Sequence, residues 1–221
     1  MLRVVSVNVA TPSLLGERRG RPVYSAIAKQ PVAGDSVWLG VGNLAGDQQG
    51  DPRAHHGPDH AVYCYSSDHV DAWSREVGRP FAPAGFGENL TLSGATEDTA
   101  WIGDVWRWGD AVVQVAQPRY PCFKLAMHTG VADMEQRLIA SGRSGWYLRV
   151  LQAGEVPVRG EIVVEDRDAA RLSVLDAHRA FSSDDPAHIA RIPALLEVPA
   201  LAEGWKRMLR RRLQIAENRA S

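Results

Sequence analysis

The sequence predicts a mainly β protein, built as a barrel or a sandwich and followed by a small helical part. Up to about residue 168, short runs of β-branched and aromatic residues recur between Gly, Pro and Gly-Asp turn signals. Repeated short strands at this spacing are typical of barrels and sandwiches. From about residue 170 the apolar residues follow a helical period instead. We therefore expect a β domain over residues 1–168 and a helical domain over residues 169–221, an α+β protein overall.

The expected strands are short and are spread over the whole first domain. They comprise residues 2–10, 61–65, 90–92, 105–117, 144–156 and 160–166. Two helices are expected between them, over residues 66–78 and 131–142, and each ends on a glycine. Three helical segments follow over residues 171–185, 186–198 and 199–220, with starts near Ser173, Asp184 or Asp185, and Pro199. Because these segments are short, they should pack on each other or on a second subunit.

Composition is that of an ordinary globular protein, with 45% hydrophobic and 23% charged residues. The net charge of −1 argues against nucleic-acid binding, and we interpret the basic run KRMLRRR as a solvated face near a helix C-terminus. No apolar stretch approaches the roughly 18 residues that a membrane span needs. Two cysteines make a disulfide framework unexpected, so we predict a cytoplasmic protein with neither nucleic acid nor membrane as partner.

The richest polar segment is the loop GDQQGDPRAHHGPDHAVYCYSSDH, residues 46–69. It holds potential metal ligands of several types, namely Asp47, Asp51, His55, His56, Asp59, His60, Cys64 and His69. A zinc site is one interpretation, although no CxxC, HExxH or HxH spacing orders these residues. A surface loop held by hydrogen bonds from Asp and His is the other.

A second motif, FGENLTLSG, places Glu88 and Asn89 at the start of an expected strand. Gly85 and Gly87 beside them indicate a close backbone approach or a positive φ. The motif is either a tight turn feeding a strand or a site where Asn89 and backbone amides hold a polar ring. Spacing alone leaves both interpretations open.

The stretch QPRYPCFKL presents a single thiol, Cys122, after two prolines and between Arg119 and Lys124. Proline disfavours helix for the residue before it, so we expect an extended backbone here and no helix N-terminus beneath the thiol. Neighbouring cations favour a thiolate, which can act as a nucleophile or as a soft metal ligand. A buried cysteine that fills the core is equally compatible. Three roles for Cys122 therefore remain open.

Taken together, these segments resemble the MOSC-domain family, the C-terminal domain type of molybdenum cofactor sulfurases, and specifically its YiiM-like branch. The likeness runs through SAIAK, the 46–69 loop, FGENLTLSG, QPRYPCFKL, SGWYLRVLQAG and the C-terminal GWKRMLRRRL. One departure stands out, because the family usually reads His-Gly-Gly-Pro-Asp where this chain has His55-His56-Gly57-Pro58-Asp59. A histidine thus replaces a glycine, and His60 stands where Arg or Lys is common.

The resemblance implies a barrel-like MOSC domain with a three-helix C-terminal domain, usually dimeric. It also implies that Cys122 is the protein ligand to molybdenum in a molybdopterin cofactor. Related proteins reduce N-hydroxylated compounds, such as hydroxylaminopurines and amidoximes, with electrons from a separate flavin reductase. His55 or Asp59 would then donate protons. The residues expected to hold the cofactor are Ser25, Lys29, Arg53, Glu88, Asn89, Arg119 and Lys124, with Arg119 and Lys29 as the leading candidates for its phosphate.

Two other functions fit the same sequence. In a sulfur carrier or cofactor-handling protein, Cys122 would hold a persulfide instead of molybdenum. A binding module that has lost its cofactor is the third, and His56 in place of glycine is the feature in its favour. Cys64 lies in the apolar run AVYCY, where core packing is the expected role.

Overall fold

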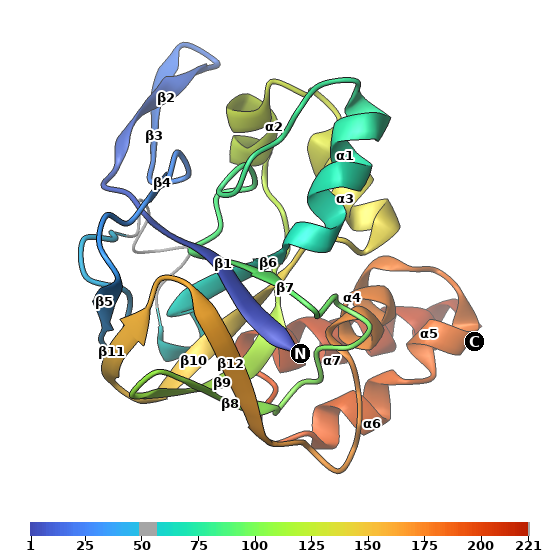
Figure 1. The fold of residues 1–221 in the computed structure, drawn as a ribbon. Coiled ribbons are helices and arrows are strands. Elements are labelled where there is room, and N and C mark those ends of the chain that lie inside the picture. Colours follow the sequence, from blue (N-terminus) through green and yellow to red (C-terminus); the bar gives the residue numbers. More distant parts are fainter. Residues whose placement is uncertain (49–56, 221) are drawn as a thin grey trace.

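The computed structural model describes residues 1–48 and 57–220, and its centre is a closed barrel of seven strands (Figure 1). These strands are β1 (Leu2–Val9), β6 (Val62–Ser66), β7 (Leu90–Ser93), β8 (Val105–Trp108), β9 (Ala111–Pro118), β10 (Trp146–Gln152) and β12 (Gly160–Asp166). They follow the order β12-β8-β9-β10-β6-β7-β1. Pairing of Leu2 in β1 with Ile162 in β12 closes the ring. The predicted mainly β fold is confirmed, as a barrel.

Five short strands lie outside the ring. The strand β4 (Gln30–Pro31) pairs with the end of β1, and β5 (Ser36–Leu39) pairs with β11 (Gly154–Pro157). A hairpin of β2 (Ser13–Arg18) and β3 (Arg21–Ser25) extends from the barrel, at the top left of Figure 1. Apart from β11, these strands were not predicted, because their sequence lacks a clear apolar alternation.

Three helices cover one end of the barrel: α1 (Val70–Val77), α2 (Phe123–Thr129) and α3 (Met134–Ser141). Two short 3-10 turns, η1 (Pro58–His60) and η2 (Ser67–His69), flank β6. Helices α1 and α3 match the expected segments, and each ends on a left-handed glycine, Gly78 or Gly142. Their apolar sides share a core cluster with β6 and Phe86, to which Trp73, Leu125 and Leu138 contribute.

The C-terminal region contains α4 (Val174–Ser182), α5 (Pro186–Ile189), α6 (Ile192–Glu197) and α7 (Glu203–Ala220). Ser173 caps α4 by a reciprocal capping box with Asp176, as its sequence position predicts. The expected segment 186–198 forms two short helices, and the last helix begins at Glu203 because residues 199–202 form its entry turn.

These helices do not form a core of their own. Their buried residues, such as Val174, Leu195 and Leu209, belong to the same hydrophobic cluster as the barrel interior. A backbone hydrogen bond from the Ile102 N–H to the Leu172 carbonyl, 2.9 Å long, also joins the barrel to the C-terminal region. The C-terminal helices therefore brace the barrel wall.

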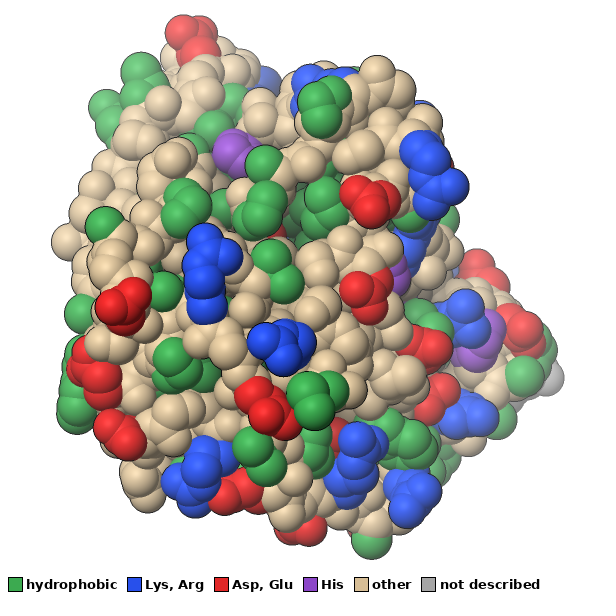
Figure 2. Space-filling model, in the orientation of Figure 1, with side chains coloured by type: hydrophobic (Ala, Val, Ile, Leu, Met, Phe, Trp, Pro, Cys, Tyr) green, Lys and Arg blue, Asp and Glu red, His purple; other side chains and the backbone are tan. Residues whose placement is uncertain are grey.

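Neither sign of charge dominates the face of the molecule that Figure 2 draws. Figure 2 shows acidic and basic side chains interspersed over the face seen in Figure 1. Within the basic run of α7, Arg212 pairs with Asp184 at 2.5 Å and Lys206 with Glu203 at 3.6 Å. No helix within the described ranges is both long enough and apolar enough to cross a membrane.

Candidate functional site

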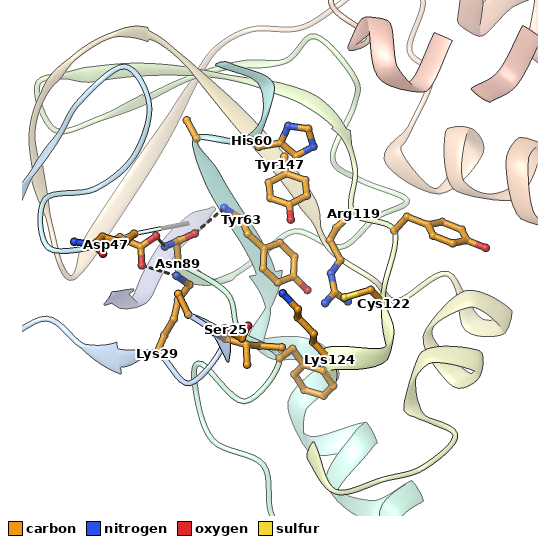
Figure 3. Close-up of a pocket in the computed structure, with 17 residues that line it drawn as sticks. Ser25, Lys29, Asp47, His60, Tyr63, Asn89, Arg119, Cys122, Lys124 and Tyr147 are labelled. Carbon is orange, nitrogen blue, oxygen red and sulfur yellow. Dashed lines mark hydrogen bonds and ion pairs between the residues drawn. The ribbon is translucent and has the colours of Figure 1, made fainter. Parts of the chain in front are cut away.

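A pocket opens where β6, β7 and β10 begin and where β9 ends (Figure 3). Six of the residues expected from the sequence to hold a cofactor or metal line it, namely Ser25, Lys29, Asn89, Arg119, Cys122 and Lys124. They come from three separate stretches of the chain. Closure of the barrel and the adjacent β3–β4 connection bring them together. Figure 3 shows Arg119, Cys122 and Lys124 converging below the rings of Tyr63 and Tyr147.

Cys122 is half-buried and its backbone is extended, with φ −135° and ψ 168°, as its proline context predicts. The expectation of no helix N-terminus beneath the thiol is wrong. Cys122 is itself the N-cap residue of α2, whose first turn starts at Phe123. Pro121 ends the extended segment without preventing the helix.

The other cysteine, Cys64, is fully buried in β6 within the barrel core. Burial raises the pKa of its thiol, so the neutral form persists. This environment is that of a packing residue.

Arg119 carries a buried positive charge without a carboxylate partner in the described parts of the chain. Its side chain is 6% exposed, and its backbone N–H donates to the carbonyl oxygen of Gly145 at 2.9 Å. The guanidinium carbon lies 5.1 Å from the centre of the Tyr63 ring, a cation–π distance. Nη1 of Arg119 is buried and has no hydrogen-bond partner among the described residues. A buried donor without a partner is costly, so this atom is suited to an anion that enters the pocket.

Burial lowers the pKa of Arg119, but the acidic groups of Tyr63, Tyr147 and Cys122 raise it by more. The guanidinium is therefore charged at all physiological pH values. Lys124 adds a second cation, and no described side chain forms an ion pair or hydrogen bond with it.

Lys29 is held differently, because its ammonium pairs with Asp47 at 2.5 Å and both side chains are buried. Burial lowers the pKa of Lys29, while the Asp47 carboxylate opposes that shift. Asp47 also accepts hydrogen bonds from Asn89 Nδ2 at 2.9 Å and from the backbone of Ala10 at 2.9 Å. Lys29, Asp47 and Asn89 thus form one buried network at the pocket wall.

Asn89 ties that network to the barrel. Its Oδ1 accepts from the backbone of Tyr63 at 3.2 Å, and its own backbone N–H donates to the Tyr63 carbonyl at 2.8 Å. The side chain therefore bridges the starts of β6 and β7. Of the two interpretations of FGENLTLSG, the structure supports a turn whose asparagine also faces a pocket.

Two residues from the expected set face elsewhere. Glu88 is fully buried, and its carboxylate accepts bonds from the backbone of Ala84 and Phe86 and from Thr91 Oγ1. Burial raises its pKa in spite of these bonds. Asp59 Oδ1 accepts from Arg149 Nε at 2.7 Å and does not line the pocket. Both carboxylates thus form hydrogen bonds within the fold and do not line the pocket.

His55 and Arg53 lie outside the described residues, as do His56 and Asp51 of the same loop. Elsewhere in the loop, His69 Nε2 lies 2.7 Å from Glu97 Oε2. Among residues 1–48 and 57–220, no group of His, Cys, Asp and Glu side chains has the arrangement of a metal site. Nothing described here supports the zinc interpretation.

Sequence reasoning missed the aromatic wall of the pocket, Tyr63, Tyr147 and Tyr120. His60, one of the potential metal ligands of the 46–69 loop, also lines the pocket. The Tyr63 and Tyr147 ring centres are 5.4 Å apart, and His60 meets Tyr147 edge-on at 4.8 Å. His60 Nε2 lies 2.7 Å from Gln117 Nε2. Only the pairing of strands β9 and β10 could have indicated Tyr147. In that pairing Tyr147 lies opposite Gln117, two residues before Arg119.

Comparison with known proteins agrees with this architecture. Residues 51–165 match the MOSC domain family, and residues 172–216 match the YiiM-like, 3-alpha helix domain. YflK of Bacillus subtilis (strain 168) is 39% identical over 203 residues, which cover 92% of this chain and 90% of YflK. A protein named Reductase from Gibberella moniliformis (strain M3125 / FGSC 7600) is 33% identical over 168 residues, 73% of this chain and 29% of that longer one.

Among solved structures, YiiM from Geobacillus stearothermophilus superposes with a TM-score of 0.79 at 33% identity. The match covers 96% of this chain and 100% of that one. The barrel, the C-terminal helices and the two family matches thus coincide, and the chain belongs to the MOSC-domain family in its YiiM-like branch.

Proposed function

We propose that this chain binds a molybdenum cofactor of the molybdopterin type through Cys122 and reduces N-hydroxylated compounds to amines. The MOSC domain is a molybdenum-cofactor-related domain, which supports the cofactor. The name Reductase of the Gibberella relative supports the reaction type. The observation that carries the proposal is a half-exposed thiol beside a buried guanidinium, in one pocket, with one N–H of the guanidinium unpaired among the described residues.

The donor set of the pocket fits such a cofactor. Molybdenum held by a pterin dithiolene accepts a further soft anionic ligand, and a cysteine thiolate is one. The cofactor phosphate requires cationic or N–H donors, which Arg119 Nη1 and Lys124 offer within the same pocket. Lys29 is already neutralised by Asp47, so we assign it to positioning of the pocket wall. When bound, the cofactor would supply the two electrons that cleavage of the N–O bond consumes.

The chain's own residues would then orient the substrate and exclude water. Tyr63 and Tyr147 form an aromatic wall on which a planar base or an amidoxime can stack. Asp59 is engaged with Arg149 and does not line the pocket, so we do not assign it a proton-donating role. We further propose that a separate flavin reductase donates the electrons and that the chain is a homodimer; the family resemblance supports both.

A reductase assay tests the proposal. The protein is produced in a host that makes the cofactor and is assayed with 6-N-hydroxylaminopurine and an artificial electron donor. We expect formation of the amine by the wild-type protein and none by Cys122→Ser. Wild-type protein that stays free of molybdenum and carries cyanide-labile sulfur on Cys122 would contradict the proposal and support the sulfur-carrier function.

A further inference from the structure

Two tyrosines flank Arg119 in the pocket, and their hydroxyl groups differ in one respect. The Tyr63 hydroxyl donates to the backbone carbonyl of Ser144 at 3.0 Å. The Tyr147 hydroxyl donates to no acceptor among the described residues, although its side chain lines the pocket. The proton of Tyr63 is therefore committed to the fold, and the proton of Tyr147 is available to a molecule in the pocket.

The position of Tyr147 is rigid. Tyr147 lies in β10 and pairs with Gln117 in β9. The centre of its ring is 5.4 Å from that of Tyr63 and 4.8 Å from that of His60. The side chain has two torsions, χ1 and χ2, and ring contacts on two sides restrict both. Figure 3 shows the Tyr147 hydroxyl directed into the pocket, toward Arg119 and Cys122.

The surroundings keep the hydroxyl protonated, and therefore able to donate, until a proton is needed. Burial and the nearby Cys122 sulfur raise the pKa of Tyr147, and only the Arg119 guanidinium lowers it. A permanent cation beside a phenol stabilises the phenolate that remains after proton transfer. Arg119 has a further N–H without a partner in the described chain, so it can serve an anion and the phenolate together.

We propose that Tyr147 is the catalytic residue that protonates the departing oxygen of the N–OH group, an inference that rests on the proposed function. The overall change is R–NHOH plus two protons and two electrons, giving R–NH2 and water. As the N–O bond breaks, Tyr147 gives its proton to the oxygen. The molybdenum cofactor, when bound and reduced by a flavin reductase, would supply the two electrons. Solvent supplies the second proton to nitrogen and returns one to the phenolate.

Tyr147→Phe tests this role, because it removes only the hydroxyl oxygen and keeps the ring. Tyr24→Phe is the matched control, because Tyr24 is an exposed tyrosine of β3 that does not line the pocket. Both variants are produced as holoprotein and are compared with wild type for molybdenum content, single-turnover rate, and Kd of 6-N-hydroxylaminopurine for the oxidised protein.

We expect Tyr147→Phe to keep its molybdenum and to lower the single-turnover rate by about 100-fold or more, the usual value of a general acid. Its Kd should change by no more than about tenfold, the value of one neutral hydrogen bond. Tyr24→Phe should resemble wild type in all three measurements. A Tyr147→Phe rate near wild type, or a loss of molybdenum from that variant, overturns the role of Tyr147 alone. Wild-type holoprotein that reduces no N-hydroxylated compound overturns the proposed function and this inference with it.

Discussion

The guanidinium of Arg119 lies over the ring of Tyr63, 5.1 Å from its centre, and one of its buried N–H groups has no partner in the described chain. A charge taken out of water without an opposite charge lowers stability unless a ligand compensates for it. The Arg119 guanidinium therefore lowers the stability of the ligand-free protein, and it stabilises an anion that binds in the pocket. This relationship leads to the first prediction.

Replacing Arg119 by Met should stabilise the cofactor-free protein and weaken cofactor binding. We expect the free energy of unfolding to rise by about 1 kcal/mol, because the buried unpaired charge is lost. Arg149→Met should lower the free energy of unfolding, because the Arg149 guanidinium donates hydrogen bonds to Asp59 and Gln114. Urea unfolding of the cofactor-free proteins measures both. An Arg119→Met variant that unfolds more easily and still holds molybdenum would contradict this view of Arg119.

Removing the Asp47 carboxylate should destabilise the protein strongly. Asp47→Ala leaves the buried ammonium of Lys29 without its partner and removes acceptors for Asn89 and Ala10. Breaking a buried pair on one side costs about 3–5 kcal/mol. Asp35→Ala, at an exposed turn, should change the free energy of unfolding by less than about 0.5 kcal/mol. Equal effects of the two changes in urea unfolding would rule out the network.

Gly145 should resist substitution more than another glycine of similar backbone conformation. Its φ is 74°, and an added Cβ would lie 2.3 Å from the carbonyl oxygen of Cys64. Gly20 has φ 73° with open space around it. Gly20→Ala should therefore cost only the left-handed strain of about 1–2 kcal/mol, and Gly145→Ala clearly more. Because the Gly145 carbonyl holds the backbone of Arg119, Gly145→Ala should also reduce molybdenum content. Thermal unfolding and metal analysis of the two variants check this.

Acid should weaken the contacts of α4 with α3 and with the segment before β10 through His178. The His178 ring is buried, and its Nε2 lies 2.9 Å from the carbonyl of Ile139 while Nδ1 lies 3.3 Å from Ser144 Oγ. Burial lowers its pKa below the ordinary value of 6.5. Between the two values the unfolded chain binds the extra proton, so the free energy of unfolding falls as pH drops below about 6.5.

The slope that this one proton contributes is at most about 1.4 kcal/mol per pH unit. Urea unfolding between pH 7 and pH 5, for wild type and His178→Gln, measures it, and the variant should show the smaller dependence. An NMR titration that places the pKa of His178 above 6.5 would reverse the sign and contradict the prediction.

Most of the fold could be predicted from the sequence, since it depends on local patterns. The runs that became β1, β8, β9, β10 and β12 alternate or cluster apolar residues between turns. Helix α4 has a local capping signal in Ser173 and Asp176. Helix α2 was missed because two prolines precede it and cysteine is an uncommon N-cap. Its one clear local mark was Gly130 at the end.

The site could be predicted only in part, for a similar reason. Cys122 and Arg119 share a short motif, so their proximity is local. The pairing of Asp59 with Arg149 spans 90 residues and depends on barrel closure. Tyr147 entered the pocket through strand register, which no single stretch encodes. Side chains such as Glu88 lie beside a site residue in sequence but on the opposite side of the backbone.

Molybdenum content is the measurement that tests the central claim most directly. Wild-type protein, Cys122→Ser and Cys64→Ser are purified from a host that makes the cofactor and are analysed by plasma mass spectrometry. The buried Cys64 controls for the loss of a thiol as such. We predict molybdenum stoichiometric with the chain in wild type and in folded Cys64→Ser, and none in Cys122→Ser. Molybdenum retained in full by Cys122→Ser would contradict the claim that Cys122 holds the metal.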